Sequence, residues 1–170
     1  MTKDIKSFEE FWPYYLEEHK NPTSRRLHFL GTSGWFTSLA ASAASSPIAF
    51  PLAMAAFGGI LKDALEKGEA EAPSKKHVIA MLAIPTPASP IAFPAGVPFA
   101  YGCAWAGHFG FEKNKPASWR YPLWSLTADW KMWFEMLQGR LWNGEDPVGE
   151  LGLEKPSEPE VTHAEPVVVA

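Results

Sequence analysis

Three histidines occupy positions in the sequence where they could bind a metal ion. His19 and His28 lie near the start of the chain, and His108 lies far beyond them. Glu112 follows His108 by four residues, so on a continuous helix the two side chains project from one face. Imidazoles with a carboxylate are ligands of non-haem Fe(II) oxygenases, and zinc accepts the same groups. The spacing therefore predicts a metal site without fixing the metal, because the sequence has no H-E-x-x-H motif and no cysteine pair.

Each histidine also has an interpretation that needs no metal. His19 fits the C-terminal end of a helix, where a cation is favoured, and His28 fits an anchor at a membrane interface. His108 and Glu112 fit a helix-stabilising pair. Further polar residues are candidates for orienting metal ligands or for holding a substrate carboxylate, namely Asn21, Asn114, Lys115 and Asp129.

Two long stretches without charged side chains separate these candidates. Residues 29–61 and 78–111 contain no Asp, Glu, Lys or Arg. Each stretch exceeds the roughly 20 residues that one transmembrane helix needs. The sequence Ser-Pro-Ile-Ala-Phe-Pro occurs at 46–51 and again at 89–94, where its prolines break or kink a helix. The pattern predicts one long tilted helix or a hairpin of two short helices in each stretch.

Aromatic stripes at helical spacing flank the two stretches. One begins after Ser7, which with Glu10 has the spacing of a capping box, and the other runs over residues 123–141. Tryptophan-rich helices suit the headgroup layer of a bilayer, although the same stripe also suits a globular core. The sequence thus predicts a small all-α integral membrane protein with two uncharged hairpins or spans flanked by amphipathic interfacial helices. Either topology returns the chain to its starting side, so the histidines and Glu112 are expected at one membrane face.

Charge is unevenly distributed in this chain of net charge −4. Residues 143–170 are acidic and contain several prolines, so we expect a disordered tail after a helical membrane domain at 1–142. In the remainder the signs are interleaved and no basic block could follow a phosphate backbone, which argues against a nucleic-acid partner. Cys103 is the single cysteine, so an intrachain disulfide is excluded.

Two separated motifs carry a family resemblance. Residues 8–32, which include His19 and His28, resemble the opening motif of the 2-hydroxy fatty acid dioxygenases. Residues 105–117, with His108, and the following segments 121–126 and 129–133 resemble the closing motif of that family. The resemblance spans residues 7–141 and implies a helical membrane enzyme that uses Fe(II) and O2 to shorten 2-hydroxy fatty acids by one carbon.

The resemblance also implies roles for individual residues. His19, His28 and His108 fall on the motif histidines of the family and are the expected iron ligands, with Glu112 as a ligand or a group behind them. Lys115 or Arg120 is expected to pair with the substrate carboxylate. The implied location is a membrane, the endoplasmic reticulum in a eukaryote or the inner membrane in a bacterium. Two alternatives stay open: a non-enzymatic membrane scaffold or lipid-binding protein, and a zinc hydrolase.

Overall fold

A computed structural model describes residues 5–67 and 74–156, and this part of the chain is helical without strands. The α-helices are α1 (Phe8–Glu17), α2 (Pro22–Ser45), α3 (Ala49–Glu66), α4 (Lys75–Ala83), α5 (Ala92–Gly107), α6 (Pro122–Leu137) and α7 (Pro147–Glu150). Two short 3₁₀ turns, η1 (Thr86–Ala88) and η3 (Ala117–Trp119), and a π-helical turn, η2 (His108–Glu112), connect them. The prediction of an all-α fold is confirmed for these residues.

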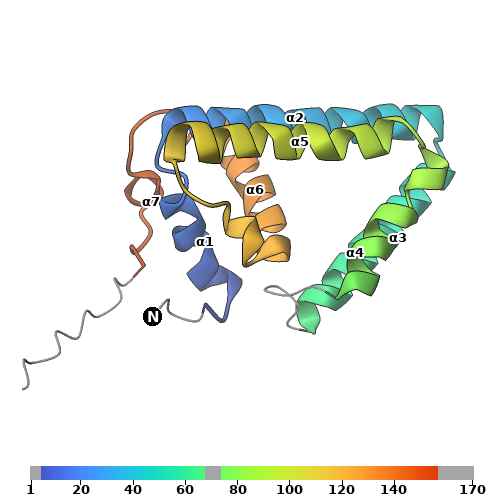
Figure 1. Ribbon diagram of the computed structural model, residues 1–170, viewed down its shortest axis with the longest axis horizontal. Coiled ribbons are helices and arrows are strands. Elements are labelled where there is room, and N and C mark those ends of the chain that lie inside the picture. Colours follow the sequence, from blue (N-terminus) through green and yellow to red (C-terminus); the bar gives the residue numbers. More distant parts are fainter. Residues whose placement is uncertain (1–4, 68–73, 157–170) are drawn as a thin grey trace, which may run out of the picture.

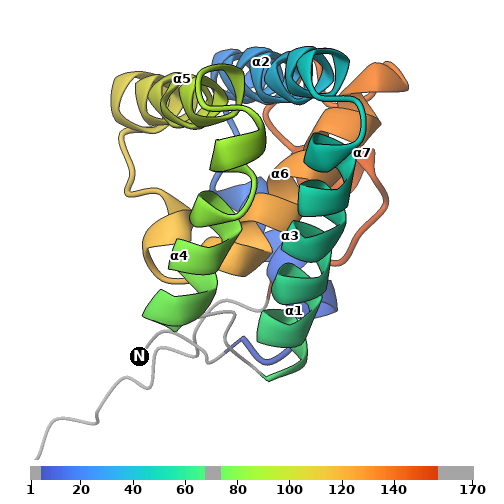
Figure 2. The same ribbon diagram turned by 90° about the vertical axis from the view of Figure 1, so that its right-hand side faces the viewer.

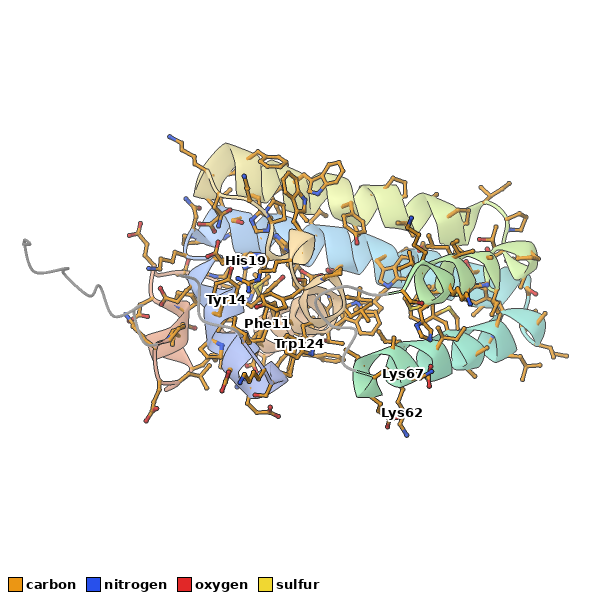
Figure 3. All side chains as sticks on the ribbon, turned by 60° about the horizontal axis from the view of Figure 1, so that its bottom comes forward. Phe11, Tyr14, His19, Lys62, Lys67 and Trp124 are labelled. Carbon is orange, nitrogen blue, oxygen red and sulfur yellow. The ribbon has the colours of Figure 1, made fainter. Side chains whose placement is uncertain are left out.

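The helices form an arch. The long helices α2 and α5 run antiparallel, side by side, along its top (Figures 1 and 2). Helices α1, α6 and α7 lie below one end of this pair, which we call the site end, and the α3–α4 hairpin descends from the other. Figure 3 shows Phe11 and Trp124 close to His19 at the site end, and Lys62 and Lys67 at the far end of α3.

Glycines allow α2 and α5 to approach closely. A Cβ atom at Gly31 would lie 2.9 Å from Cβ of Cys103, and one at Gly107 would lie 2.8 Å from Oγ of Ser24. At Gly31 a side chain would force α2 and α5 apart, and at Gly107 it would displace the Ser24 hydroxyl, so glycine favours both contacts. Because Gly107 immediately precedes His108, its close contact with α2 also fixes the distance between His108 and the start of α2.

The repeated Ser-Pro-Ile-Ala-Phe-Pro sequence forms the two corners of the arch. Helix α2 ends at Ser45 before the first copy, and α5 begins at Ala92 within the second, so both copies interrupt the helices as their prolines predict. The phenylalanines of the two copies, Phe50 and Phe93, are buried and their ring centroids lie 5.9 Å apart. The repeat therefore pairs with itself and joins the two corners.

The prediction of an integral membrane protein, in the endoplasmic reticulum or a bacterial inner membrane, is wrong. Within residues 5–67 and 74–156, no helix combines the length and the apolar composition needed to cross a bilayer. The repeat divides each uncharged stretch into shorter helices, and α5 has 16 residues where about 20 are needed. Helix α2 is longer, but it begins with Arg25 and Arg26 and is rich in Ser and Thr. The membrane prediction treated both uncharged stretches as apolar enough to enter a bilayer.

The aromatic stripe of α1 is a core element rather than the face of an interfacial helix. Phe11, Trp12 and Tyr15 of α1 are at most 3% exposed and pack with Met132 and Met136 of α6. The stripe predicted over residues 123–141 is only partly buried, because Phe134 and Leu137 are 56% and 53% exposed. The face of α6 that packs against α1 therefore carries methionines in place of the predicted aromatic residues.

The segment that begins the predicted tail contributes to this core. Val148 of α7 is fully buried against it, and Glu150 accepts a hydrogen bond of 2.6 Å from the backbone of Leu141. Residues 157–170, the second half of the predicted disordered tail, lie outside the described residues. The domain boundary at residue 142 stays a prediction.

Candidate metal centre

The structure brings His19, His28 and His108 together from three different elements. His19 follows the end of α1, His28 lies on the second turn of α2, and His108 opens η2. All three are buried, and their ring centroids lie 4.5 to 5.2 Å apart. One ring nitrogen of each lies within 4.8 Å of the corresponding nitrogens of the others. A single ion could therefore be reached by all three imidazoles.

The Nδ1 atom of each histidine has an oxygen partner that fixes the ring. His19 Nδ1 lies 2.5 Å from the carbonyl oxygen of Tyr15, and His28 Nδ1 lies 2.7 Å from Oδ1 of Asp129. His108 Nδ1 lies 2.8 Å from Oδ1 of Asn114. A carbonyl and a carboxylate only accept, so Nδ1 of His19 and His28 donates its proton.

Two hydrogen bonds to Glu18 fix the orientation of the Asn114 side-chain amide. Its Nδ2 donates to the carbonyl oxygen of Glu18 at 2.9 Å and to Oε2 of Glu18 at 2.8 Å, so its Oδ1 must accept from His108. All three rings thus carry a proton on Nδ1, which leaves Nε2 as the nitrogen that could bind a metal. Outer hydrogen bonds of this kind orient histidines that bind metals.

The Nε2 atoms of His19 and His28 are buried and have no hydrogen-bond partner among the residues that the structure describes. Buried polar atoms are rarely left unpaired, because each costs free energy, so their arrangement calls for an occupant. A metal ion bound by neutral imidazoles fits this requirement.

Burial disfavours the charged form of His19 and His108. Burial, and then the neighbouring histidines, hold the pKa of His19 well below its usual value of 6.5. Burial, followed by the charge of His28, lowers the pKa of His108 to about 4. Metals bind the unprotonated imidazole, so this environment prepares the ligands at neutral pH.

Asp129 connects His28 to two other elements. Its Oδ1 accepts from the hydroxyl of Tyr15 at 3.2 Å, and its Oδ2 accepts from the hydroxyl of Thr32. The carboxylate of α6 is therefore held by donors from α1 and α2 while it holds the ring of His28. Asp129 was predicted to orient ligands, and the structure places it where it can.

Glu112 lies apart from the three histidines. Its Oε1 accepts from the backbone N–H of Asn21 at 2.9 Å, and Asn21 in turn caps α2 through the N–H of Thr23. An acidic group at the first turn of a helix is favoured by the free N–H groups there. Burial raises the pKa of Glu112. Glu112 thus holds η2, which begins with His108, against the start of α2.

Arg25 connects separate segments of the chain at the site end. It is fully buried, and its guanidinium donates to five backbone carbonyl groups. One belongs to His19, at 2.8 Å, and another to Leu141, at 2.7 Å. The arginine therefore links the segment that follows α1, where His19 lies, to the loop after α6.

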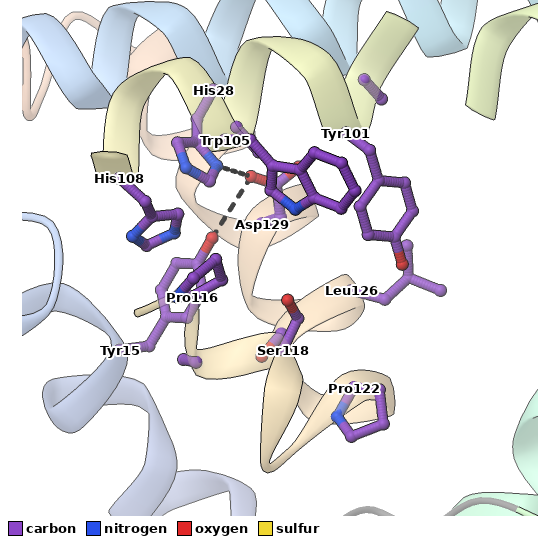
Figure 4. Close-up of a pocket in the computed structure, with 14 residues that line it drawn as sticks. Tyr15, His28, Tyr101, Trp105, His108, Pro116, Ser118, Pro122, Leu126 and Asp129 are labelled. Atoms are coloured by element: carbon purple, nitrogen blue, oxygen red, sulfur yellow. Dashed lines mark hydrogen bonds and ion pairs between the residues drawn. The ribbon is translucent and has the colours of Figure 1, made fainter. Parts of the chain in front are cut away.

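A pocket of about 90 Å³ adjoins the histidines (Figure 4). His28, His108 and Tyr15 lie at one end of it, and Tyr101 and Leu126 lie at the other. Lys115 and Arg120, predicted to hold a substrate carboxylate, do not line it. Lys115 is exposed, and the guanidinium of Arg120 lies 5.1 Å from the centre of the Tyr121 ring.

Several residues of the site escape the sequence reasoning. Tyr15 was assigned only to an aromatic stripe, although it precedes His19 by one helical turn, which was an available signal. Glu18 and Thr32 contact Asn114 and Asp129 over about a hundred residues of sequence. No spacing in a single sequence reveals such pairs.

A protein that is helical over its described residues, with a buried centre of three histidines and an adjoining pocket, is the class that these observations define. The family model described as "2-hydroxy-palmitic acid dioxygenase Mpo1-like" matches residues 5–141, and the chain belongs to this family. Its name points to a dioxygenase, hence an oxidoreductase, and confirms the predicted family. No curated protein and no solved structure shows a significant match to this chain.

Proposed function

We propose that the protein is an Fe(II)-dependent dioxygenase that shortens 2-hydroxy fatty acids by one carbon. In this reaction a 2-hydroxy acid and O2 give the acid one carbon shorter, CO2 and water. The bond between C1 and C2 breaks, C2 is oxidised from an alcohol to a carboxylic acid, and C1 leaves as CO2. These changes release four electrons, which O2 accepts, so no other reductant is needed.

The observation that carries this proposal is the convergence of three histidine nitrogens beside a pocket. His19, His28 and His108 would hold the iron through Nε2, with their rings oriented by Tyr15, Asp129 and Asn114. Three imidazoles that hold ferrous iron would leave positions on it for the substrate and O2, and the iron would supply the oxygen chemistry. The family name supports the substrate class.

The chain positions the three ligands. The short hydrogen bonds at Nδ1 prevent the rings from rotating, and the rings of His28 and His108 also line the pocket, so a substrate there would lie beside the metal. Apolar groups such as Trp105, Leu126 and Ala117 line the pocket, and they favour an alkyl substituent over a polar one.

Zinc is the second candidate metal. Within residues 5–67 and 74–156 the centre consists of three histidines without a carboxylate, a ligand set that catalytic zinc also uses. A zinc protein of this kind would activate water, and it would neither consume O2 nor change the length of a 2-hydroxy acid.

Product analysis tests the proposal. Protein purified without oxygen and loaded with Fe(II) is given 2-hydroxypalmitate and O2, and the products are identified by mass spectrometry. We expect pentadecanoate and CO2, with one O2 consumed for each product. His108→Ala should abolish the reaction, whereas His77→Ala, a matched change at the hairpin end, should retain it. An unchanged chain length in the presence of bound iron would refute the proposal.

A further inference from the structure

The pocket beside the histidines is much smaller than a long-chain fatty acid. Its volume of about 90 Å³ has room for roughly six to nine water-sized atoms, at about 10–15 Å³ each. The 2-hydroxy-carboxylate group alone has five non-hydrogen atoms. At most a few methylene groups fit beside it, so the rest of an alkyl chain must leave the pocket.

Ser125 of α6 offers a polar contact for this group, one helical turn before Asp129, which contacts His28. Ser125 lines the pocket, is 6% exposed, and its hydroxyl has no hydrogen-bond partner within the described residues. A buried hydroxyl without a partner costs free energy that a ligand oxygen would recover. Neither Lys115 nor Arg120 reaches this pocket, so Ser125 is the better candidate for contacting the polar end of the substrate.

The end of the pocket away from His108 is open and aromatic. Tyr101 and Trp105 line it from α5, one helical turn apart, and each is 46% exposed. Their ring centroids lie 6.1 Å apart, and Figure 4 shows both rings on the side of the pocket away from His108. The ridge formed by Tyr101 and Trp105 is thus continuous with the pocket and gives an emerging chain an apolar surface on one side.

We propose that the pocket binds only the hydroxy-carboxylate end of the substrate, contacted by Ser125, and that the alkyl chain leaves over Tyr101 and Trp105. Substrate selection then depends on the 2-hydroxy acid group, and chain length is tolerated. This inference rests on the proposed function and adds where each part of the substrate lies.

Chain-length dependence is the expected signature. A methylene enclosed on all sides lowers KM about fourfold, and one lying on an exposed ridge gives about half of that free energy, or about twofold. The ridge covers about 6 Å along α5, so the gain should end at roughly ten carbons. Beyond that length KM should become constant, while kcat should change little from the shortest acid to the longest.

The experiment compares 2-hydroxyhexanoate, 2-hydroxydecanoate and 2-hydroxypalmitate below their micelle concentrations. Binding to iron-loaded protein is measured without oxygen by equilibrium dialysis, and turnover is measured with oxygen. Ser125→Ala should weaken binding of all three acids by a similar factor of about ten. Trp105→Ala and Tyr101→Ala should reduce the preference for the longer acids several-fold. Phe134→Ala removes an aromatic of similar exposure on another surface and should leave that preference unchanged.

Two failures can be told apart. If only the long acid is turned over and 2-hydroxyhexanoate neither binds nor reacts, a deep channel must enclose the chain. The inference would then be wrong while the proposed function survives. If no 2-hydroxy acid of any length binds or reacts, the proposed function and the inference fall together.

Discussion

The two ends of the arch are held together by different forces. At the site end, polar side chains bind segments that are distant in sequence, as Arg25 does with Leu141 and His28 with Asp129. At the hairpin end, the corners meet through the rings of Phe50 and Phe93 and through one buried hydrogen bond from Ser89 to Ser42, at 2.8 Å. The long-range polar contacts of the site end involve charged side chains and orient the histidine rings, whereas those of the hairpin end only join helices that turn.

Arg25→Met tests the site end and has the largest expected effect. The change leaves five carbonyl groups without their donor inside the protein, so unfolding should become easier by about 4 kcal/mol. Denaturant unfolding measures this. Arg26→Met is the control, because Arg26 is exposed, and it should cost less than about 1 kcal/mol. Equal costs for the two variants would contradict the role given to Arg25.

Phe93→Ala tests the hairpin end. Phe93 is 1% exposed and contacts Phe50 and Trp35, so its truncation should cost about 3 kcal/mol in unfolding free energy. Because its contacts lie away from the histidines, the folded variant should retain the metal affinity of the wild type. Ile91→Ala, at an exposed position of the same repeat, should change stability by less than about 0.5 kcal/mol. A loss of metal affinity in Phe93→Ala would mean that the two ends are coupled.

The pH dependence of the metal-free protein should come from the site end. The folded pKa of His108 is about 4 and its ordinary value is 6.5, so the unfolded chain binds the proton more readily. Stability is therefore fully present above pH 6.5 and is lost as the pH falls toward 4, by about 2 kcal/mol between pH 7.5 and 5 for this residue alone. His19 acts in the same direction. Denaturant unfolding of His108→Gln should show a smaller loss, and an identical loss would exclude His108 as the source.

Asp129→Asn tests whether a carboxylate at the site end matters more for metal affinity than one at the hairpin end. The amide keeps the size of the side chain but removes the charge that orients His28, so metal affinity should fall 10- to 100-fold. The matched control is Asp63→Asn, because Asp63 holds the ring of His77 at 2.9 Å at the hairpin end. Competition with a chelator measures both variants. A similar effect of the two changes would remove the special role of Asp129.

The sequence predicted the metal centre better than its surroundings. His19, His28 and His108 were chosen because they are unusual in type and place, and the fold brings them together. Helix breaks at the repeat followed from proline chemistry. The membrane prediction failed because lack of charge was taken for apolarity, although hydroxyls and glycines in α2 and α5 serve close helix contacts.

The partners of the histidines were harder to predict for a physical reason. Asp129 meets His28 across 101 residues of sequence, and Asn114 meets Glu18 across 96. Such pairs depend on how α6 and η2 pack below α2, which local spacing does not determine. The pocket is a property of the same packing, so the sequence named Lys115 and Arg120 by charge and missed Ser125 and Trp105.

The most direct test of the account is the metal content of protein purified without oxygen, with wild type beside His19→Ala, His28→Ala and His108→Ala. The account predicts close to one iron per chain in the wild type and its loss in all three variants, with His77→Ala retaining iron and far-ultraviolet circular dichroism showing that each variant folds. Zinc in place of iron would contradict the oxygenase. No bound metal, even after addition of Fe(II), would contradict the metal centre itself and favour a helical protein without this chemistry.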